Sequence, residues 1–444
     1  MKNVVLVLTL LSASVWAQPS PQNSAVPTSD QPDNAALMQK IRDLEDRVIA
    51  LEGQLRTMKS QSAPPPTAAP APEAPVAGQP GQQPPAASQT QQQVAEMPPA
   101  PAYTSSQPVS LGGAGGSAAK ALNPDISAIG DFIGVAGHNP VQPSRSLEMH
   151  ESEIGMQAII DPYARGDFFF SFGEEGVEVE EGYITLTALP AGFVMKVGKM
   201  RSAFGKVNGM HNHVLPWVDR PLVMNNLVGG EDGIDDAGVS VQRILPAPKG
   251  IFLEATGQLF RGDSGTTQSP LFVSSNKSDV AAVAHLRSYK DLSESTNLDL
   301  GLSYARGHND QGSDFLTQLY GIDATLRWKP LRRSIYHSFV GRGEFVWSQR
   351  QQFPMEQKAF GFYTSGDYQM GRRWFLGGRF DRSSRSEFAN LNDQGVSALL
   401  TYWPSEFSQV RGQYRFMHYA GNIDTHEFLM QFIFSLGAHG AHPF

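Results

Sequence analysis

The sequence has no cysteine, few charged residues and, after its first 20 residues, no long apolar run. The lack of cysteine excludes disulfide scaffolds, thiolate zinc sites, iron–sulfur clusters and cysteine nucleophiles. Charged residues make up 18% of the chain, below the roughly 25% of an ordinary soluble domain. No later run approaches the ~20 apolar residues that a membrane-spanning helix requires.

What the chain does contain is 25 Phe and 43 Gly among its 444 residues. Its 35 basic and 43 acidic residues give a net charge of −8, which argues against a nucleic-acid partner because such partners need a basic face. A chain that is rich in Phe and Gly, poor in charge and without a helical span suits a membrane β-barrel.

Residues 1–17 have the pattern of a secretory signal peptide. Lys2 precedes an apolar stretch over 4–11, and the small residue Ala17 ends the segment. The apolar stretch is too short to cross a bilayer, so we expect removal after Ala17 and exclude the segment from the fold. A membrane anchor is the alternative. Residues 18–34, rich in Pro, Ser and Asn, form a flexible lead.

Residues 35–60 carry apolar side chains at alternating spacings of four and three. The heptad positions a and d are occupied by Leu37, Ile41, Leu44, Val48, Leu51, Leu55 and Met58. This 3.5-residue period predicts a short α-helical coiled coil that mediates oligomerisation. The period does not choose between a dimer and a trimer, and an amphipathic helix packed on its own barrel is the alternative.

Residues 61–120 are rich first in Pro, Ala and Gln and then in Gly and Ser, with almost no charge. Such a composition cannot bury enough apolar surface to offset its ordering entropy, so we predict a disordered linker. The Gly-rich stretch at 112–117 follows no strand and precedes no phosphate-binding lysine, which argues against a nucleotide loop.

From 121 to 444 the apolar residues recur at every second position, as in Leu298, Leu300, Leu302 and Tyr304. The intervening positions hold Gly, Ser, Thr, Arg and Asp, the lipid-out, water-in pattern of an outer-membrane barrel. Turn signals divide the region into sixteen segments, joined by short turns and longer loops in alternation. We predict an all-β, 16-stranded antiparallel transmembrane β-barrel whose two ends face the periplasm.

Sixteen strands leave an aqueous lumen. The longest loop, 202–236, mixes apolar and charged residues, and loops of this length are usually functional. We expect it to fold into the barrel as a constriction that presents Lys206, Arg220, Glu231 and Asp232 to solutes. Packing over the rim or against a neighbouring subunit is the alternative.

If the apolar residues face lipid, charged residues at alternate positions face the lumen. The inward basic residues are Lys196, Arg287, Arg327, Arg342, Arg379, Arg411 and Arg415, and the inward acids are Glu254, Asp299, Asp323, Glu344 and Asp381. Rings of such charges set ion preference, and the basic residues cluster on the later strands. We predict a mild anion preference, with paired charges and little net selectivity as the alternative.

The sequence contains only weak candidates for a metal site or a catalytic motif. His211 and His213 are candidate metal ligands, but two imidazoles without an identifiable third ligand do not define a site, so no metal is expected. The Gly-Asp-Ser-Gly sequence at 262–265 imitates a serine-protease motif but reads as a turn. We therefore expect that the protein has no cofactor and no enzymatic activity.

Two stretches carry a resemblance to a known family. Glu180-Glu181-Gly-Tyr-Ile-Thr-Leu-Thr-Ala-Leu-Pro is followed by Met195-Lys-Val-Gly-Lys-Met-Arg-Ser-Ala-Phe-Gly-Lys206. Together they resemble the strand–turn–strand core of phosphate-selective porins of the O and P type. The start of the barrel, Asn123-Pro-Asp-Ile-Ser127, is similar to a bacterial group often labelled zinc-regulated outer membrane receptors. The resemblance is specific over 120–240 and implies trimers of sixteen-stranded channels.

The sequence departs from this family at two points. Phe444 stands where a terminal Phe is expected, but residues 437–443 interrupt the alternation that should lead to it. The family's phosphate-binding lysine ladder has no residue-by-residue match here, so phosphate specificity is not carried over.

The sequence thus predicts a porin in the outer membrane of a Gram-negative bacterium, with its N-terminal region in the periplasm. It would let small hydrophilic solutes diffuse passively, and its expected partners are outer-membrane lipid, further copies in a trimer and the barrel-assembly machinery. The alternatives are a structural barrel tethered to the periplasm by its coiled coil and a metal-related outer-membrane uptake protein.

Overall fold

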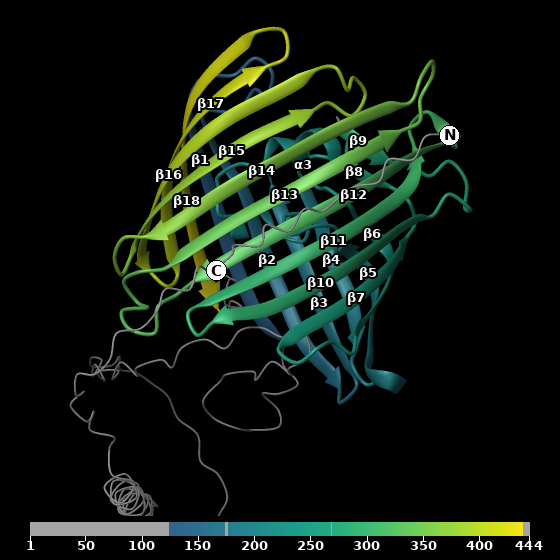
Figure 1. Ribbon diagram of the computed structural model, residues 1–444, viewed down its shortest axis with the longest axis horizontal. Helices are drawn as coiled ribbons and strands as arrows, with labels where there is room; N and C mark the ends of the chain where they lie inside the picture. The colour runs from purple at the N-terminus through teal and green to yellow at the C-terminus, as the bar shows by residue number, and fades with distance from the viewer. Residues whose placement is uncertain (1–123, 174–175, 268, 438–444) are drawn as a thin grey trace, which may run out of the picture. The chain divides into compact units, whose positions relative to one another are not determined.

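The computed structural model describes residues 124–437, except 174–175 and 268. Sixteen antiparallel strands form a closed barrel in which every connection joins neighbouring strands (Figure 1). Closure pairs the first strand with the last, from Ser127 opposite Gly437 to His138 opposite His426. The sheet therefore has no unpaired edge. The sixteen strands predicted from the sequence are confirmed.

The wall strands are β1 (Asp125–His138), β2 (Leu147–Asp161), β3 (Ala164–Gly173), β4 (Gly176–Leu186), β5 (Phe193–Arg201), β6 (Asp235–Ile244), β7 (Ile251–Phe260), β10 (Ala281–Ser293), β11 (Thr296–Asn309), β12 (Gly312–Trp328), β13 (Phe339–Arg350), β14 (Gln357–Gln369), β15 (Trp374–Ser384), β16 (Asn392–Ser405), β17 (Ser408–Tyr419) and β18 (Ile423–Gly437). β8 (Ser264–Thr266) and β9 (Ser269–Phe272) form a two-stranded sheet separate from the barrel sheet, and the short helices are η1 (Pro190–Gly192), η2 (Asn212–Val214) and α3 (Leu222–Leu227).

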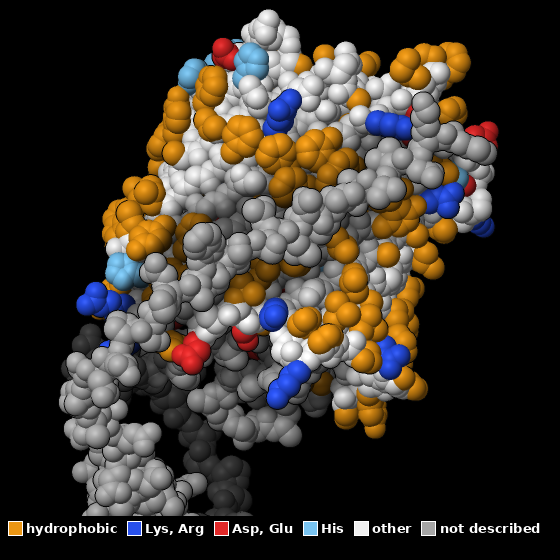
Figure 2. Space-filling view, in the orientation of Figure 1, with side chains coloured by type: hydrophobic (Ala, Val, Ile, Leu, Met, Phe, Trp, Pro, Cys, Tyr) orange, Lys and Arg blue, Asp and Glu red, His pale blue; other side chains and the backbone are white. Residues whose placement is uncertain are grey.

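Along most of the wall, the strands bury their polar side chains and expose their apolar ones. On β18, Glu427 and Gln431 are almost fully buried, whereas Phe428 and Met430 between them are 51% and 45% exposed. Because neighbouring residues of a strand point to opposite faces, the polar set lines the lumen and the apolar set covers the outside. Figure 2 shows hydrophobic side chains spread over the outer wall, with scattered charged ones.

The hydrophobic core lies inside the barrel, between the wall and the connection from β5 to β6. This connection, residues 202–234, contains η2 and α3 and is called the lumen segment below. Its apolar side chains, including Phe204, Trp217 and Val223, are fully buried against inward-facing wall residues such as Leu319 and Val346. Helix α3 packs against β13, β14 and β15. The segment thus occupies the lumen rather than the rim.

Two features of the connections differ from the sequence prediction. The loop at 262–279 contains the β8–β9 hairpin, whose Thr266 donates a backbone hydrogen bond to Gly229 O of the lumen segment. The connections from β11 to β12 and from β17 to β18, expected as longer loops, are tight turns, because these four strands extend further than their alternation indicated.

The predicted signal peptide, lead, coiled coil and linker all lie outside the described residues, as do residues 438–444. Within the part of the chain that the structure describes, no helix is long and apolar enough to cross a membrane.

Candidate functional site

The lumen segment is bound to the wall first through Glu344 of β13. This fully buried carboxylate accepts hydrogen bonds from the backbone N–H groups of Lys206 and Val207, at 3.1 and 3.3 Å. Gly205 precedes them with a φ of +61°, and a Cβ at this position would overlap Glu344 Oε1. Glycine is therefore required where the chain turns from β5 into the lumen.

A second attachment is made by Asp219, in the middle of the segment. Its carboxylate lies 3.0 Å from Arg379 Nη2 and 2.8 Å from Arg415 Nη1, and it also accepts a hydrogen bond from Gln413. The Arg379 guanidinium lies over the Trp217 ring, 5.0 Å from its centroid. Burial alone would raise the pKa of Asp219, but the two guanidinium groups hold it well below its usual range.

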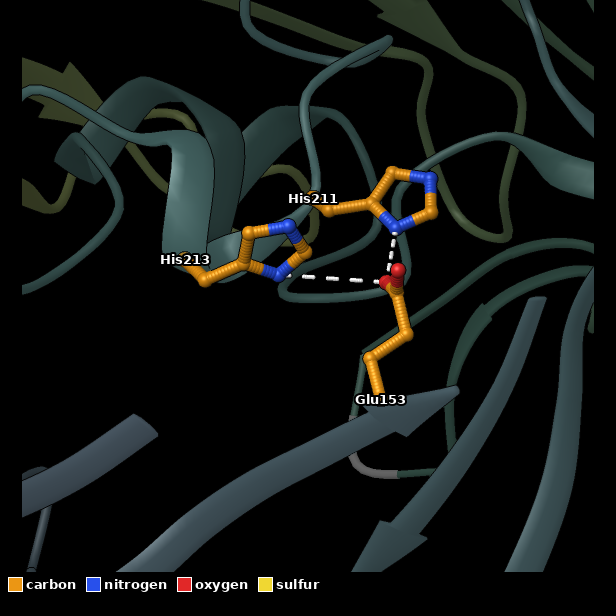
Figure 3. A group of neighbouring side chains, drawn as sticks. All are labelled: Glu153, His211 and His213. Atoms are coloured by element: carbon orange, nitrogen blue, oxygen red, sulfur yellow. Dashed lines mark hydrogen bonds and ion pairs between the residues drawn. The ribbon is translucent and has the colours of Figure 1, made fainter. Parts of the chain in front are cut away.

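The third attachment is made by the two histidines near η2 (Figure 3). His211 Nδ1 lies 2.6 Å from Glu153 Oε2 of β2, and its Nε2 lies 2.9 Å from Glu181 Oε2 of β4. His213 Nδ1 lies 3.8 Å from the same oxygen of Glu153. Burial lowers the pKa of His211, but Glu180, Glu153 and Glu181 more than compensate and raise it well above 6.5.

Two carboxylates reach this cluster from adjacent positions of β4. Glu180 and Glu181 are both largely buried, although consecutive strand residues normally face opposite sides. A register shift between Phe169 and Phe170 of β3 leaves Glu180 without a partner across the ladder, the mark of a β-bulge. The bulge re-aims one side chain, so that both carboxylates enter the lumen.

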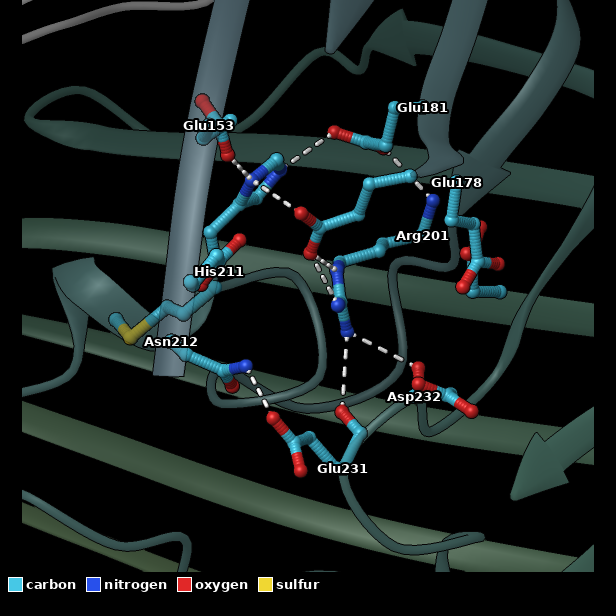
Figure 4. Close-up of polar contacts among 12 residues, drawn as sticks. Glu153, Glu178, Glu181, Arg201, His211, Asn212, Glu231 and Asp232 are labelled. Atoms are coloured by element: carbon cyan, nitrogen blue, oxygen red, sulfur yellow. Dashed lines mark hydrogen bonds and ion pairs between the residues drawn. The ribbon is translucent and has the colours of Figure 1, made fainter. Parts of the chain in front are cut away.

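Arg201, the last residue of β5, connects this acidic group to the end of the lumen segment (Figure 4). Its Nε donates to Glu180 Oε1 at 3.2 Å, and its Nη1 donates to the carbonyl oxygens of Glu231 and Asp232 at 3.3 and 3.0 Å. Burial would raise the pKa of Glu231, but His150, 3.2 Å away, and nearby guanidinium groups lower it to about 2.

Several basic residues proposed from the sequence gather around Asp299. Arg287 makes two hydrogen bonds to this carboxylate, at 2.9 and 2.8 Å. Lys206 Nζ and Arg327 Nη1 approach its Oδ2 at 3.5 and 3.9 Å. Lys196 lies over the Tyr183 ring in the same cavity. The structure thus brings three of the proposed basic residues together around Asp299, with Lys196 in the adjoining cavity.

The remaining basic residues hold other parts of the structure. Arg342 pairs with Asp367, and Arg415 pairs with Glu427 in addition to Asp219. Arg411 donates to Leu215 O of the lumen segment at 2.8 Å. Arg220 makes its contacts within the lumen segment, where it donates hydrogen bonds to the carbonyl oxygens of Val207 and Met210.

Cavities lie on both sides of the lumen segment. One, of about 620 Å³, opens at the barrel end that carries loop 139–146; we call it the loop-end cavity. A second, of about 320 Å³, contains Lys196 and Asp299, and Arg201 lines both it and the loop-end cavity. A third, of about 230 Å³, opens at the opposite end, beside turn 329–338; we call it the turn-end cavity.

Sequence reasoning missed three residues that organise the site: Asp219, Glu153 and Arg201. Glu153 stood at an inward position of an alternating strand, so the period could have indicated it. Asp219 lies in a loop, where no period exists, and only the tertiary contacts show its role.

Comparisons with known proteins place the fold. No model of a known protein family matches the chain. An uncharacterized protein of Aquifex aeolicus (strain VF5) is 28% identical over 389 residues, which cover 73% of this chain and 81% of that protein. The match to phosphate-selective porins therefore stays a prediction.

Two solved structures share the barrel. OmpTdeltaL8, a loop L8 deletion mutant of the outer membrane protein OmpT of Vibrio cholerae, superposes with a TM-score of 0.51 at 9% identity, covering 71% of this chain and all of that chain. The anion-selective porin from Comamonas acidovorans has a TM-score of 0.50 at 10% identity, covering 71% of this chain and 99% of that one. The chain thus has a porin-like barrel fold.

Proposed function

We propose that this protein is a channel in the outer membrane of a Gram-negative bacterium, through which small hydrophilic solutes diffuse passively. The observation that carries the proposal is a closed barrel of sixteen strands with an apolar outside, a polar inside and cavities on both sides of the lumen segment. An apolar outer wall suits the hydrocarbon of a bilayer, which would be the lipid partner.

We further propose that the lumen segment is the constriction of this channel. It contacts β2 through His211, β13 through Lys206 and β17 through Asp219, so it reaches widely separated parts of the wall. A segment that is attached to the wall at several points narrows the path of a solute through the barrel and stays in place as the solute passes.

Single-channel recording tests both parts, and the lack of cysteine makes a site-specific version possible. Wild-type protein in planar bilayers is expected to give discrete conductance steps. In Lys206→Cys, a bulky methanethiosulfonate reagent should lower the conductance, because the side chain lines a lumen cavity. Met355→Cys, on an exposed loop, is the matched control. A silent wild-type barrel would contradict the channel, and equal effects in both variants would contradict the constriction.

The charges of the proposed channel are divided along its axis. Seven carboxylates line the loop-end cavity with two guanidinium groups: Glu148, Glu151, Glu178, Glu180, Glu231, Asp232 and Asp235, with Arg145 and Arg201. The turn-end cavity has four basic and two acidic residues: Arg327, Lys329, Arg342 and Arg411, with Asp367 and Glu406. We therefore propose that the anion preference expected from the sequence is confined to the turn end and is opposed by the larger excess of carboxylates at the loop end.

Reversal potentials in a salt gradient check this balance. Wild-type channels are expected to show weak selectivity, and E231Q combined with D232N should shift the reversal potential toward anions because two loop-end carboxylates are neutralised. Glu356→Gln, an exposed acid that lines neither of these two cavities, should cause no shift. Strong cation selectivity that survives the double substitution would contradict the proposal.

For assembly, we propose a homotrimer supported by the heptads at 35–60 in the periplasm, inserted by the barrel-assembly machinery. A barrel tethered to the periplasm by this coiled coil is the structural alternative, and a non-conducting protein would favour it. A metal-related uptake protein is a second candidate, favoured by one observation: Glu153, His211 and His213 lie together.

A further inference from the structure

We propose that Glu153, His211 and His213 form a binding site for a divalent transition metal of the zinc class, which links the lumen segment to strand β2. One potential ligand atom from each of the three lies within 4.8 Å of the others. Two come from the lumen segment and one from the wall, as Figure 3 shows. The site does not depend on whether the barrel conducts.

The donor set selects the class of metal. Two imidazole nitrogens and one carboxylate oxygen are the ligands of a three-residue zinc site with an open fourth position. Calcium and magnesium are bound by oxygen ligands, in larger number for calcium and with near-ideal octahedral geometry for magnesium, so imidazoles argue against both. Imidazole also suits copper, nickel and cobalt, and the site is therefore assigned to the class rather than to one metal.

The two distances from Glu153 to the imidazole nitrogens require only a small adjustment. Ligand atoms about 2.0–2.1 Å from a tetrahedral zinc ion stand about 3.3 Å apart. Glu153 Oε2 lies 2.6 Å from His211 Nδ1 and 3.8 Å from His213 Nδ1. Binding would open the first contact by less than about 1 Å and close the second by about half that. The hydrogen bond between Glu153 and His211 would be replaced by two metal bonds.

A second observation favours the binding of a cation at this place. Glu151, Glu153 and Glu180 also bring one carboxylate oxygen each to within 4.8 Å of one another. The side chains of Glu151 and Glu180 are 5% and 9% exposed, and the Oε2 atom of each accepts no hydrogen bond from the described residues. Imidazole nitrogens approach these two oxygens at longer range: His211 Nδ1 lies 3.5 Å from Glu180 Oε2, and His213 Nδ1 lies 3.9 Å from Glu151 Oε2. Buried carboxylates in such proximity repel each other, and contacts of this length offset their desolvation only in part.

The charge balance supports the same conclusion. Four carboxylates, Glu151, Glu153, Glu180 and Glu181, surround His211, with Arg201 as the neighbouring guanidinium. Four carboxylates oppose the Arg201 guanidinium and a protonated His211, so the group has a net charge of about −2, and a metal ion would displace the proton from His211. A divalent cation would reduce this excess to about −1 while leaving the Arg201 pair intact.

An access route exists from both ends of the barrel. Glu151 and Glu180 line the loop-end cavity, and His213 lines the turn-end cavity. Glu181, which lies 2.9 Å from His211 Nε2, can hold the ring in place from behind while Nδ1 faces the ion. Carboxylates in this position orient and strengthen an imidazole ligand.

Cobalt(II) binding to the purified full-length protein in detergent tests the site. One equivalent per chain with the visible absorption of tetrahedral cobalt is expected, displaced by zinc. E153Q and H213Q should each weaken binding by an order of magnitude or more, since each removes one of three ligands. The matched control is H418Q, which removes an exposed histidine that is likewise paired with a carboxylate, Asp424.

Two variants keep the test decisive. E153Q retains the side-chain volume, and H213Q leaves the bond between Glu153 and His211 in place, so folding can be checked for each by heat-dependent migration on gels. No cobalt binding by folded wild type would overturn the site, as would binding that is unchanged in the folded variants. Because the assay does not require conductance, its failure is separate from failure of the proposed channel.

Discussion

Replacing Asp219 with alanine is expected to release the middle of the lumen segment and to raise the single-channel conductance about twofold or more, because an emptied barrel of this size leaves an open aqueous lumen. The Asp219 carboxylate forms ion pairs with two guanidinium groups, those of Arg379 and Arg415. Removing one partner of a buried ion pair costs up to about 3–5 kcal/mol, and the cost is lower here because Arg379 keeps Asp381 and Arg415 keeps Glu427.

The control for this substitution is Asp263→Ala in the connection from β7 to β10. Asp263 also pairs with an arginine, Arg261, but both side chains are substantially exposed, so its loss should leave the conductance unchanged. A D219A channel with wild-type conductance, or an equal rise in both variants, would show that Asp219 does not hold the constriction.

Acid should not imitate the D219A substitution until the pH is very low. The pKa of Asp219 is depressed in the folded state, so its stabilising contribution is present above the usual value of about 3.9 and is lost only as the pH falls through the depressed value. The conductance difference between wild type and D219A is therefore expected to persist at pH 4. Its disappearance at pH 5 would mean that the carboxylate is not paired as described.

Gly198→Val is expected to abolish barrel closure. Gly198 has a φ of +144°, and a Cβ there would lie 2.1 Å from Gly182 O and 2.7 Å from Tyr183 Cα on the paired strand β4. A residue with a Cβ pays about 1–3 kcal/mol for such a backbone conformation, before the overlap with the backbone is counted. The overlap cannot be relieved by a rotamer change. We expect little folded protein, measured by heat-dependent migration on gels.

Gly257→Val is the matched control. This glycine lies within strand β7, has no heavy atom within 4 Å of its would-be Cβ, and is exposed on the outer wall. Valine fits an exposed strand position, so the variant should fold as wild type does. Equal folding of both variants would show that the ladder between β4 and β5 tolerates a displacement at Gly198.

The wall could be predicted from the sequence because the property that makes it is periodic. Alternation along a strand such as β11 specifies which side chains face out, and the spacing of the turns specifies how many strands there are. The inward charges followed from the same period. The predicted coiled coil at 35–60 rests on an equally regular pattern, but it lies outside the described residues.

The site could not be predicted in this way. Glu180 and Glu181 are neighbours in sequence, and strict alternation would have sent one of them outward; the β-bulge in the β3–β4 ladder turns both inward. The metal candidates, His211 and His213, lacked a third ligand because Glu153 lies 58 residues before His211 in the chain. No spacing rule connects a loop to a strand so far away.

The sequence by itself therefore determined the barrel, its strand number and the face that most wall residues take, since these depend on local periodicity and turn chemistry. Only the tertiary structure decided that residues 202–234 lie inside the barrel rather than over its rim, that Asp219 joins Arg379 to Arg415, and that a carboxylate of β2 meets two loop histidines. Those contacts bury apolar residues of the segment such as Trp217. They also pair inward-facing wall charges, which the closed barrel keeps away from bulk water.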